Sequence, residues 1–221
     1  RELHLGTFSI VREGTRVALG DLLDSSGGQA HQRAIYVGTG RYLGDGAYLA
    51  NPQNSDILNT DMQSFYAIRD DADDLKNWGS FRSQAGVKHF TMTGSGNGRS
   101  IDYEAVLASG PGWYLDFDVQ SGERVVINPR LLSGDQKTLT VISSIPDPNS
   151  MCRIGGTSYV YFLETQPTKA HKSLNGSISY ISSAMAVGAA VVDIPGVGIT
   201  LEINRSDGEI DKIPGPGRQG T

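Results

Sequence analysis

The acidic run DDADD at residues 70–74 has the residue types and spacing closest to a metal site in this sequence. Asp71 and Asp73 alternate as the first carboxylate ligands of a calcium loop do. Such a loop also needs an oxygen ligand at its fifth position and a glycine at its sixth. Counted from Asp71, these positions hold Leu75 and Lys76, and neither can serve. We therefore interpret the run as a solvated loop and assign no metal ligand.

The other patterns that could do chemistry are equally incomplete. Asp116 and Asp118 alternate, but they precede the turn at residues 120–122, and capping of that turn explains them. The GSGNG segment at residues 94–98 lacks the Lys-Ser/Thr ending of a phosphate-binding loop and predicts a β-turn. No serine lies in a Gly-x-Ser-x-Gly elbow. No metal-binding cluster includes any of the four histidines, His4, His31, His89 and His171. The sequence therefore indicates no catalytic, cofactor-binding or metal-binding residue, and we expect a protein that is not an enzyme.

The composition indicates an all-β protein. Glycine accounts for 28 of 221 residues, well above its usual share of about 7%, and it has no collagen-like period. Frequent glycines mean frequent turns between short strands. The net charge of -5 and the scattered lysines and arginines argue against a nucleic-acid partner. The most apolar stretch, residues 184–194, is much shorter than the ~20 residues of a membrane helix, so we expect no membrane span.

Cys152 is the single cysteine, so the chain cannot form an internal disulfide. This fits a reducing compartment, and it fits equally well a partner cysteine outside the chain. The sequence begins at Arg1 without a signal peptide, so for a secreted protein it would be a mature or excised piece.

Alternating or clustered apolar residues predict short strands separated by turn residues. In the segment WYLDFD, residues 113–118, Trp113, Leu115 and Phe117 fall on one face. Pro129 suits an edge or a bulge. The predicted strands are residues 33–39, 64–70, 87–93, 113–118, 124–132, 138–145, 158–164, 184–194, 199–204 and 209–213.

The spacing of these strands predicts a β-propeller with an incomplete ring. Residues 113–164 hold four candidates joined by short loops, which is the content of one blade. Residues 184–213 hold most of another blade, and residues 33–70 hold two strands around the insert 45–61. The total amounts to about three or four blades, the low end of the ~4–8 that close a ring. We expect a poorly matched N-terminal blade segment at 1–32, propeller blades at 33–213 and a Pro/Gly-rich tail at 214–221.

Two stretches of the chain carry more specific motifs. The first, residues 34–71, reads AIYVGTGRYLG, a variable insert and DMQSFYAIRDD. The second, residues 112–164, contains GWYLDF, SGERVVINPRLL and MCRIGGTSYVYFLE in that order. In combination they resemble the C-terminal propeller of the PilY-type family of type IV pilus assembly factors and tip adhesins. The chain departs from that family where its calcium loop is expected, upstream of the first stretch, and in its C-terminal tail.

The resemblance implies a quinoprotein-like β-propeller in a protein exported through the periplasm to the outer membrane, cell surface or pilus tip. It implies binding of minor pilins, other pilus-tip components or a host surface, through loops such as 45–61 and 146–150. No cofactor is visible, and calcium is implied only for the full-length protein. Three motif glycines would allow positive φ or close backbone approach: Gly38, Gly40 and Gly44. Four motif aromatics would pack in the core: Tyr36, Trp113, Tyr114 and Tyr161.

Two other functions stay open. A carbohydrate-binding propeller would share only the scaffold with this family. The run SFYAIRDDADDLKNW, residues 64–78, also resembles a blade end of the quinoprotein dehydrogenases, with Trp78 as the tryptophan that docks one blade on the next. Those enzymes need a ring of paired cysteines over the quinone, and this chain has Cys152 alone. Because a fold does not determine a function, we rank the pilus-associated surface protein first.

Overall fold

The structure is a computed structural model. It describes residues 16–22, 32–42, 56–70, 79–106, 110–132, 138–149, 155–167, 169, 171–172, 178–182, 184–196 and 198–216. These residues form strands and two short 3₁₀ helices, η3 (Phe81–Ser83) and η4 (Gly96–Gly98), so the all-β prediction is confirmed for this part of the chain. The strands are β1 (Arg16–Leu22), β2 (Gln32–Gly38), β3 (Ser64–Asp70), β4 (Lys88–Thr93), β5 (Ser100–Tyr103), β6 (Gly112–Asp116), β7 (Arg124–Val125), β8 (Arg130–Leu131), β9 (Thr138–Pro146), β10 (Gly156–Glu164), β11 (His171–Lys172), β12 (Ile178–Ile181), β13 (Ala186–Ile194), β14 (Gly198–Arg205) and β15 (Ile210–Pro214).

The strands form three open sheets. Sheet 1 has the order β1-β2-β3-β6-β4-β5-β11, sheet 2 the order β12-β10-β9-β7, and sheet 3 the order β13-β14-β15. The short strand β8 also pairs with β9 in sheet 2. Within sheet 1, β4 and β6 are parallel, whereas β6 is antiparallel to its other neighbour, β3.

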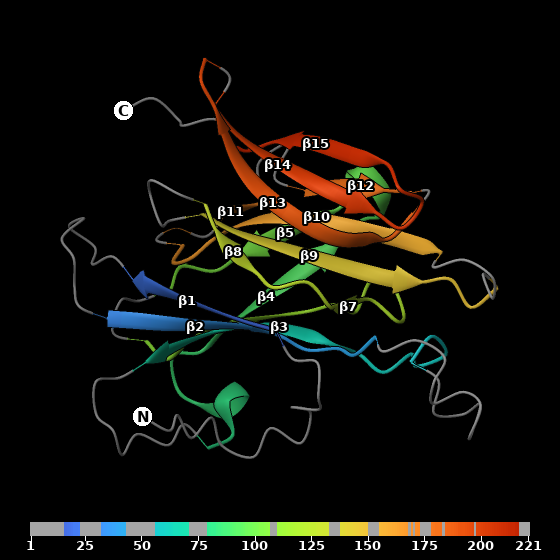
Figure 1. The fold of residues 1–221 in the computed structure, drawn as a ribbon. Coiled ribbons are helices and arrows are strands. Elements are labelled where there is room, and N and C mark those ends of the chain that lie inside the picture. The colour runs from blue at the N-terminus through green and yellow to red at the C-terminus, as the bar shows by residue number, and fades with distance from the viewer. Residues whose placement is uncertain are drawn as a thin grey trace.

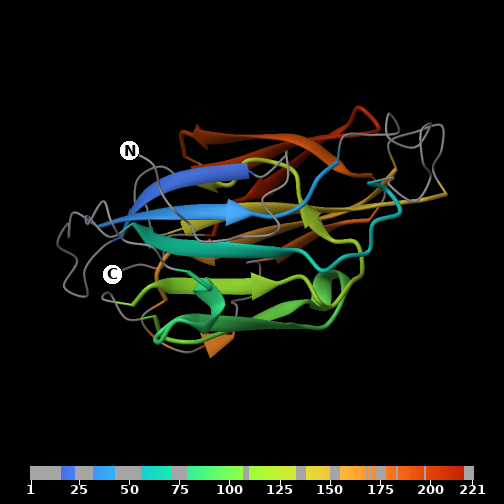
Figure 2. The same cartoon turned by 90° about the horizontal axis from the view of Figure 1, so that it is seen from below.

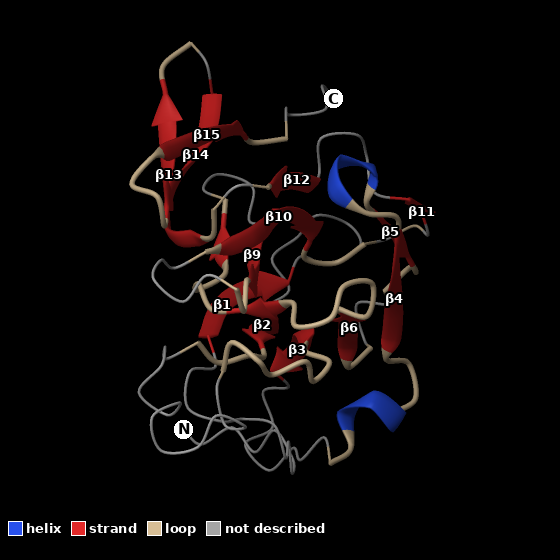
Figure 3. Ribbon diagram, turned by 90° about the vertical axis from the view of Figure 1, so that its right-hand side faces the viewer, coloured by secondary structure: helices blue, strands red, loops and turns tan. Residues whose placement is uncertain are grey.

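The three sheets lie in layers, with sheet 2 in the middle. Figure 1 shows sheet 3 above β9 and β10, and β1, β2 and β3 of sheet 1 below them. Seen from below, β1, β2, β3, β6 and β4 run side by side (Figure 2). Figure 3 shows sheet 1 curving, so that β4, β5 and β11 rise along one side of sheet 2.

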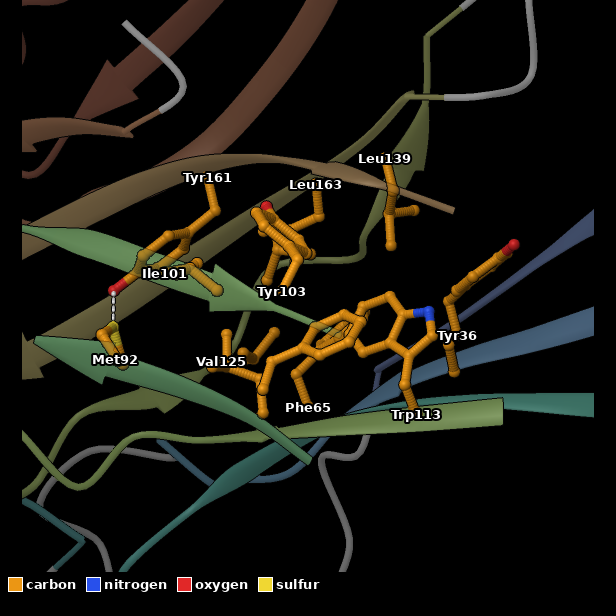
Figure 4. Close-up of a cluster of buried hydrophobic side chains, with 14 of the residues drawn as sticks. Tyr36, Phe65, Met92, Ile101, Tyr103, Trp113, Val125, Leu139, Tyr161 and Leu163 are labelled. Atoms are coloured by element: carbon orange, nitrogen blue, oxygen red, sulfur yellow. Dashed lines mark hydrogen bonds between the residues drawn. The ribbon is translucent and has the colours of Figure 1, made fainter. Parts of the chain in front are cut away.

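The middle position of sheet 2 explains the sequence of β10. Its residues alternate between two buried faces, because each face is covered by another sheet. Tyr161 and Leu163 face the core shared with sheet 1, and Val160 and Phe162 face the core shared with sheet 3. Figure 4 shows Leu139, Tyr161 and Leu163 pointing from sheet 2 toward Phe65 and Trp113 of sheet 1. A strand covered on both faces reads as a continuous apolar run, as SYVYFL does.

Strand β6 follows the predicted alternation but lies in another sheet than expected. Trp113 and Leu115 are buried toward sheet 2, while Tyr114 lies on the opposite, outer face of sheet 1. The expectation that residues 113–164 form one blade is therefore wrong, because β6 pairs with β3 and β4 and leaves sheet 2 to β7, β9, β10 and β12. The pairing partner of a strand depends on contacts far apart in sequence, which spacing alone does not reveal.

No closed ring is formed by the strands that the structure describes. Sheet 3 connects consecutive antiparallel strands, as a propeller blade does, whereas sheet 2 pairs β7 with β9 and β10 with β12, and sheet 1 contains a parallel pair. In the described part of the chain, no helix is long and apolar enough to cross a membrane.

Candidate functional site

Several loops meet at one end of the sheets, at the right of Figure 1. We call residues 39–42, 56–63 and 117–124 together the loop platform. Their backbones are joined directly: the Phe117 N–H donates to the Gln63 carbonyl oxygen at 3.0 Å, and the Thr39 N–H donates to that of Ser64 at 2.9 Å. The Val125 N–H in turn donates to the Thr39 carbonyl oxygen at 3.1 Å. The platform is thus tied to both sheet 1 and sheet 2.

Two glycines allow this close approach. A Cβ on Gly38 would lie 2.5 Å from the Cβ of Val125, and a Cβ on Gly40 would lie 2.5 Å from that of Arg124. Gly40 also has φ of +132°, which L side chains rarely adopt. The predicted role of these glycines is confirmed, and the VGTG and GERVV motifs lie against each other. Gly44 lies outside the described residues.

The Arg124 side chain holds the loops of the platform together. Its guanidinium is buried and donates to backbone carbonyl oxygens from three separate segments. Burial lowers the pKa of Arg124, and the Asp56 carboxylate opposes that effect. A second ion pair joins Arg41 Nε to Asp56 Oδ1 at 2.8 Å. The acceptors of Arg124 are the carbonyl oxygens of Gly122 (2.8 Å), Arg41 (3.1 Å), Asn59 (2.5 Å) and Asp56.

The platform exposes apolar side chains. Leu58 is 50% exposed, Met62 51% and Val119 36%. Asp61 and Asp118 beside them are exposed as well. The predicted projecting insert, residues 45–61, contributes its described part, 56–61, to this surface, and the described residues of the loop 146–150 follow β9 at the same end. The structure therefore presents apolar groups on loops fixed by a buried cation.

A buried ion pair includes one residue of the platform, Glu123. Arg99 Nη1 contacts Glu123 Oε2 at 2.6 Å, and both side chains have 0% exposure. Tyr161 and Ser143 of sheet 2 donate to Glu123 Oε1 at 2.5 and 2.6 Å. The Arg99 guanidinium lies 3.6 Å from the centroid of the Tyr159 ring. This network joins the segment before β5 to sheet 2, and the residue after Glu123 is the platform arginine, Arg124.

The pKa shifts in this network keep Arg99 charged and Tyr161 protonated, as in a structural ion pair. Burial lowers the pKa of Arg99, but the Tyr161 hydroxyl and the Glu123 carboxylate outweigh it and raise that pKa. Burial, and then the Glu123 carboxylate, raise the pKa of Tyr161 well above its ordinary value. Because no atom of the Arg99 or Glu123 side chain reaches solvent, the pair has no access to a substrate.

The buried Tyr161 hydroxyl predicts a loss of stability at alkaline pH. An unfolded tyrosine releases its proton near pH ~10. The folded protein keeps the proton to higher pH, so the unfolded state binds fewer protons there and the free energy of unfolding falls as pH rises. We expect Tyr161 to contribute up to about 1.4 kcal/mol of this fall per pH unit, and Tyr161→Phe to remove its share. Urea unfolding followed by circular dichroism between pH 8 and pH 11 measures it, and an equal slope in the variant would contradict the assignment.

A second polar cluster lies on the outer face of sheet 1. Asp116 accepts hydrogen bonds from Arg82 Nη2 and Nη1 at 2.6 and 3.0 Å and from Ser64 Oγ at 2.5 Å. His89 Nε2 lies 3.3 Å from the same carboxylate. The predicted turn-capping role of Asp116 is therefore wrong: its side chain is 9% exposed and serves as the ion-pair partner of Arg82.

Aromatic rings line this cluster. Tyr66, Tyr114 and His89 face one another across β3, β6 and β4, because they are register partners. The rings of Tyr114 and His89 stack at 4.4 Å, and Arg82 lies 4.4 Å from the Tyr114 centroid. Tyr114 is thus partly buried and packs against the smaller hydrophobic cluster on the outer face of sheet 1, not in the main core that was predicted for it. Tyr36, Trp113 and Tyr161 do lie in the core, as predicted.

Neither cluster is arranged for catalysis. The Ser64 hydroxyl donates to Asp116, whose carboxylate is ion-paired with Arg82, and the described polar contact of His89 is with Asp116 and not with the serine. A hollow beside Trp113, lined by Ala34 and Ala67, has a volume of about 10 Å³, which is enough for roughly one water molecule. Among the described residues, no group of three or more metal-ligating side chains occurs.

Several residues singled out in the sequence lie outside the described residues. These are the possible calcium ligands Asp71 and Asp73, the possible docking residue Trp78, the lone Cys152, and His4 and His31. The ion pair between Arg99 and Glu123 and the Arg124 contacts were not predicted. A glutamate and an arginine next to each other in GERVV, between a turn and an apolar strand, were the available signal.

Comparison with protein-family models, curated proteins and solved structures finds no match for this chain.

Proposed function

We propose that this chain is the binding part of a PilY-type cell-surface protein that contacts minor pilins or other pilus-tip components through the loop platform. The observation that carries the proposal is the platform itself, on which Leu58 and Met62 are about half exposed while Arg124 holds their loop. Rigid loops are suited to binding, because little conformational freedom is lost when a partner docks.

The convergence of the resembling motifs supports the family assignment. VGTGRYLG and GERVV contribute Gly40 and Arg124, which touch each other. QSFYAI and GWYLDF form β3 and β6, which pair and lead into the platform. Four motifs spread along the sequence therefore act in one local structure, as a set of family-defining residues would.

The chemistry of the platform favours a protein partner with a basic rim. Apolar residues surrounded by charged ones are the usual anatomy of a protein interface. Asp61 and Asp118 are the exposed charges next to Leu58, Met62 and Val119. Their negative charge favours association with lysine or arginine side chains, and such attraction weakens with added salt.

The proposal includes a propeller fold for the exported protein. Sheets 2 and 3 are antiparallel and pack face to face through Val160, Phe162 and Leu201, as successive blades do, and sheet 3 connects consecutive strands. In the proposal these two sheets are blades of the exported surface protein, and the loop platform lies at one end of them.

Carbohydrate binding is the second candidate. It is favoured by the half-exposed His89 ring, which stacks on Tyr114 beside the Asp116 carboxylate on the outer face of sheet 1. It ranks second because sugars stack on free aromatic faces, and the Tyr114 ring is already in contact with both His89 and Arg82.

Binding of purified minor pilins to the immobilised 221-residue chain tests the proposal. We expect saturable binding by surface plasmon resonance. We expect the double variant Leu58→Ser/Met62→Ser to weaken it at least tenfold, because truncation of a central apolar contact costs about 1–2 kcal/mol or more. The matched control is Ile210→Ser, which removes a similarly exposed apolar side chain, 56% exposed, from β15 of sheet 3.

Two outcomes would overturn the proposal. One is the absence of pilin binding, and the other is equal loss of binding in the platform variant and in the Ile210 control. A glycan array that shows one saturable sugar, with binding lost on His89→Ala, would replace the proposal with the carbohydrate candidate.

A further inference from the structure

The two edges of sheet 3 differ in how they are protected. An edge strand exposes unpaired backbone groups, and natural proteins usually block it with charges or proline. Strand β15 carries Asp211, Lys212 and Pro214 within five residues. Strand β13 has the sequence AVGAAVVDI, with no proline and no charge before Asp193. It is also the longer strand, with nine residues. Its register shifts between Ala186 and Gly188, an irregularity of the kind that protects an edge, so the open part of this edge begins at Gly188.

The hydrogen-bond pattern shows which groups of β13 face outward. In an antiparallel sheet, the successive residues of a central strand bond alternately to the strands on its two sides. Ile199 accepts from the Gly215 N–H at 2.8 Å, and Arg205 donates to Glu209 at 2.9 Å, so the odd-numbered residues of β14 bond toward β15. The even-numbered residues of β14 then bond toward β13.

The register gives the partners of these even-numbered residues. Thr200, Glu202 and Asn204 lie opposite Val192, Ala190 and Gly188. The intervening residues of β13 therefore direct their N–H and C=O groups away from β14. These residues are Ala189, Val191 and Asp193, and in the described part of the chain no backbone hydrogen bond to another strand uses them.

We propose that this open edge pairs with the same edge of a second copy of the chain, which joins two copies of sheet 3 into one six-stranded sheet. This inference is independent of the proposed pilus function. An antiparallel pairing centred on Ala190 and limited to the regular part of β13 sets Ala189 opposite Val191 and Gly188 opposite Val192. No like charges then face each other, and the centre of the pair holds only small side chains. The edge is thus self-complementary, which a two-fold interface requires.

Sedimentation velocity of the 221-residue chain at about 1 to 100 µM tests the pairing, a range suited to a weak interface. We expect a species of twice the 23.6 kDa of one chain to form as the concentration rises. Ala189→Pro removes an outward N–H and leaves the bonds to β14 in place, so we expect it to abolish the larger species. The matched control is Ile210→Pro, an outward position on β15, where natural Pro214 is tolerated. We expect it to dimerise as the unchanged chain does.

Hydrogen exchange locates the interface independently of the variants. We expect the amides of Ala189, Val191 and Asp193 to be protected at high concentration and to exchange freely at low concentration. A chain that stays monomeric at about 100 µM would overturn the proposal. So would a dimer that survives Ala189→Pro in a folded variant, or a dimer in which these three amides stay unprotected.

Discussion

Gly112→Ala is expected to destabilise the protein by about 3–5 kcal/mol, the size of a severe backbone conflict. Gly112 has φ of +131°, in the region that side chains avoid. A Cβ there would overlap the carbonyl oxygen of Ala67 on the neighbouring strand. That oxygen belongs to the β3–β6 pairing, in which Ala67 lies opposite Trp113. The substitution therefore cannot be relieved by rotating a side chain; two central strands of sheet 1 must move apart.

Chemical denaturation followed by circular dichroism measures this effect. Gly98→Ala is the matched control, because a Cβ on Gly98 meets no atom within 4 Å and its φ is not positive. We expect the control to change the free energy of unfolding by less than about 1 kcal/mol. Equal stability of the two variants would show that the strands are not in this close contact.

Glu123→Gln is expected to cost about 3–5 kcal/mol of stability, because it leaves the Arg99 guanidinium buried without its counter-charge. Both side chains have 0% exposure, so water cannot replace the lost partner. The Tyr161 and Ser143 hydroxyls that donate to the carboxylate would also meet a weaker acceptor. Replacing both members, Arg99→Met with Glu123→Leu, is expected to recover much of the loss, since no buried charge then remains.

The control for this experiment is a surface ion pair. Lys88 Nζ lies 3.0 Å from Glu104 Oε2, and the Glu104 side chain is 53% exposed. Glu104→Gln is expected to cost less than about 1 kcal/mol, because solvent screens exposed pairs. If Glu123→Gln and Glu104→Gln lower the free energy of unfolding equally in urea denaturation, the buried ion pair does not stabilise the protein more than the exposed one.

The two neighbouring residues Glu123 and Arg124 link stability to the proposed binding surface. The Glu123 side chain turns into the interior toward Arg99 and Tyr161, and the Arg124 side chain turns toward the carbonyl oxygens of the loop platform. This alternation is that of an extended strand. The loops that expose Leu58 and Met62 are thus anchored by the residue next to a fully buried ion pair.

The sequence determined most of the longer strands and the buried faces of two of them. It did not predict β1, β5, β11 and β12, and the predicted strand 124–132 is two short strands, β7 and β8. The alternation of WYLDFD placed Trp113 and Leu115 on the buried face, and the continuous apolar run of SYVYFL matched a strand covered on both sides. These features are local, because a strand's side chains alternate whatever its partner. The motifs VGTG and GERVV were also predicted to belong to one combination, and in the structure Gly38 and Gly40 lie against Val125 and Arg124.

Only the tertiary structure decided which strands share a sheet and which charges meet. The parallel pairing of β4 with β6, and with it the place of Trp113 in sheet 1, joins strands whose order in the sheet differs from their order in the chain. Arg99 and Glu123 are 24 residues apart, and Asp116 is 34 residues from Arg82. A buried charge is tolerated only where an opposite charge and hydrogen-bond donors surround it. That surrounding exists only after the sheets have packed, so Asp116 and Glu123 read as ordinary polar residues in the sequence.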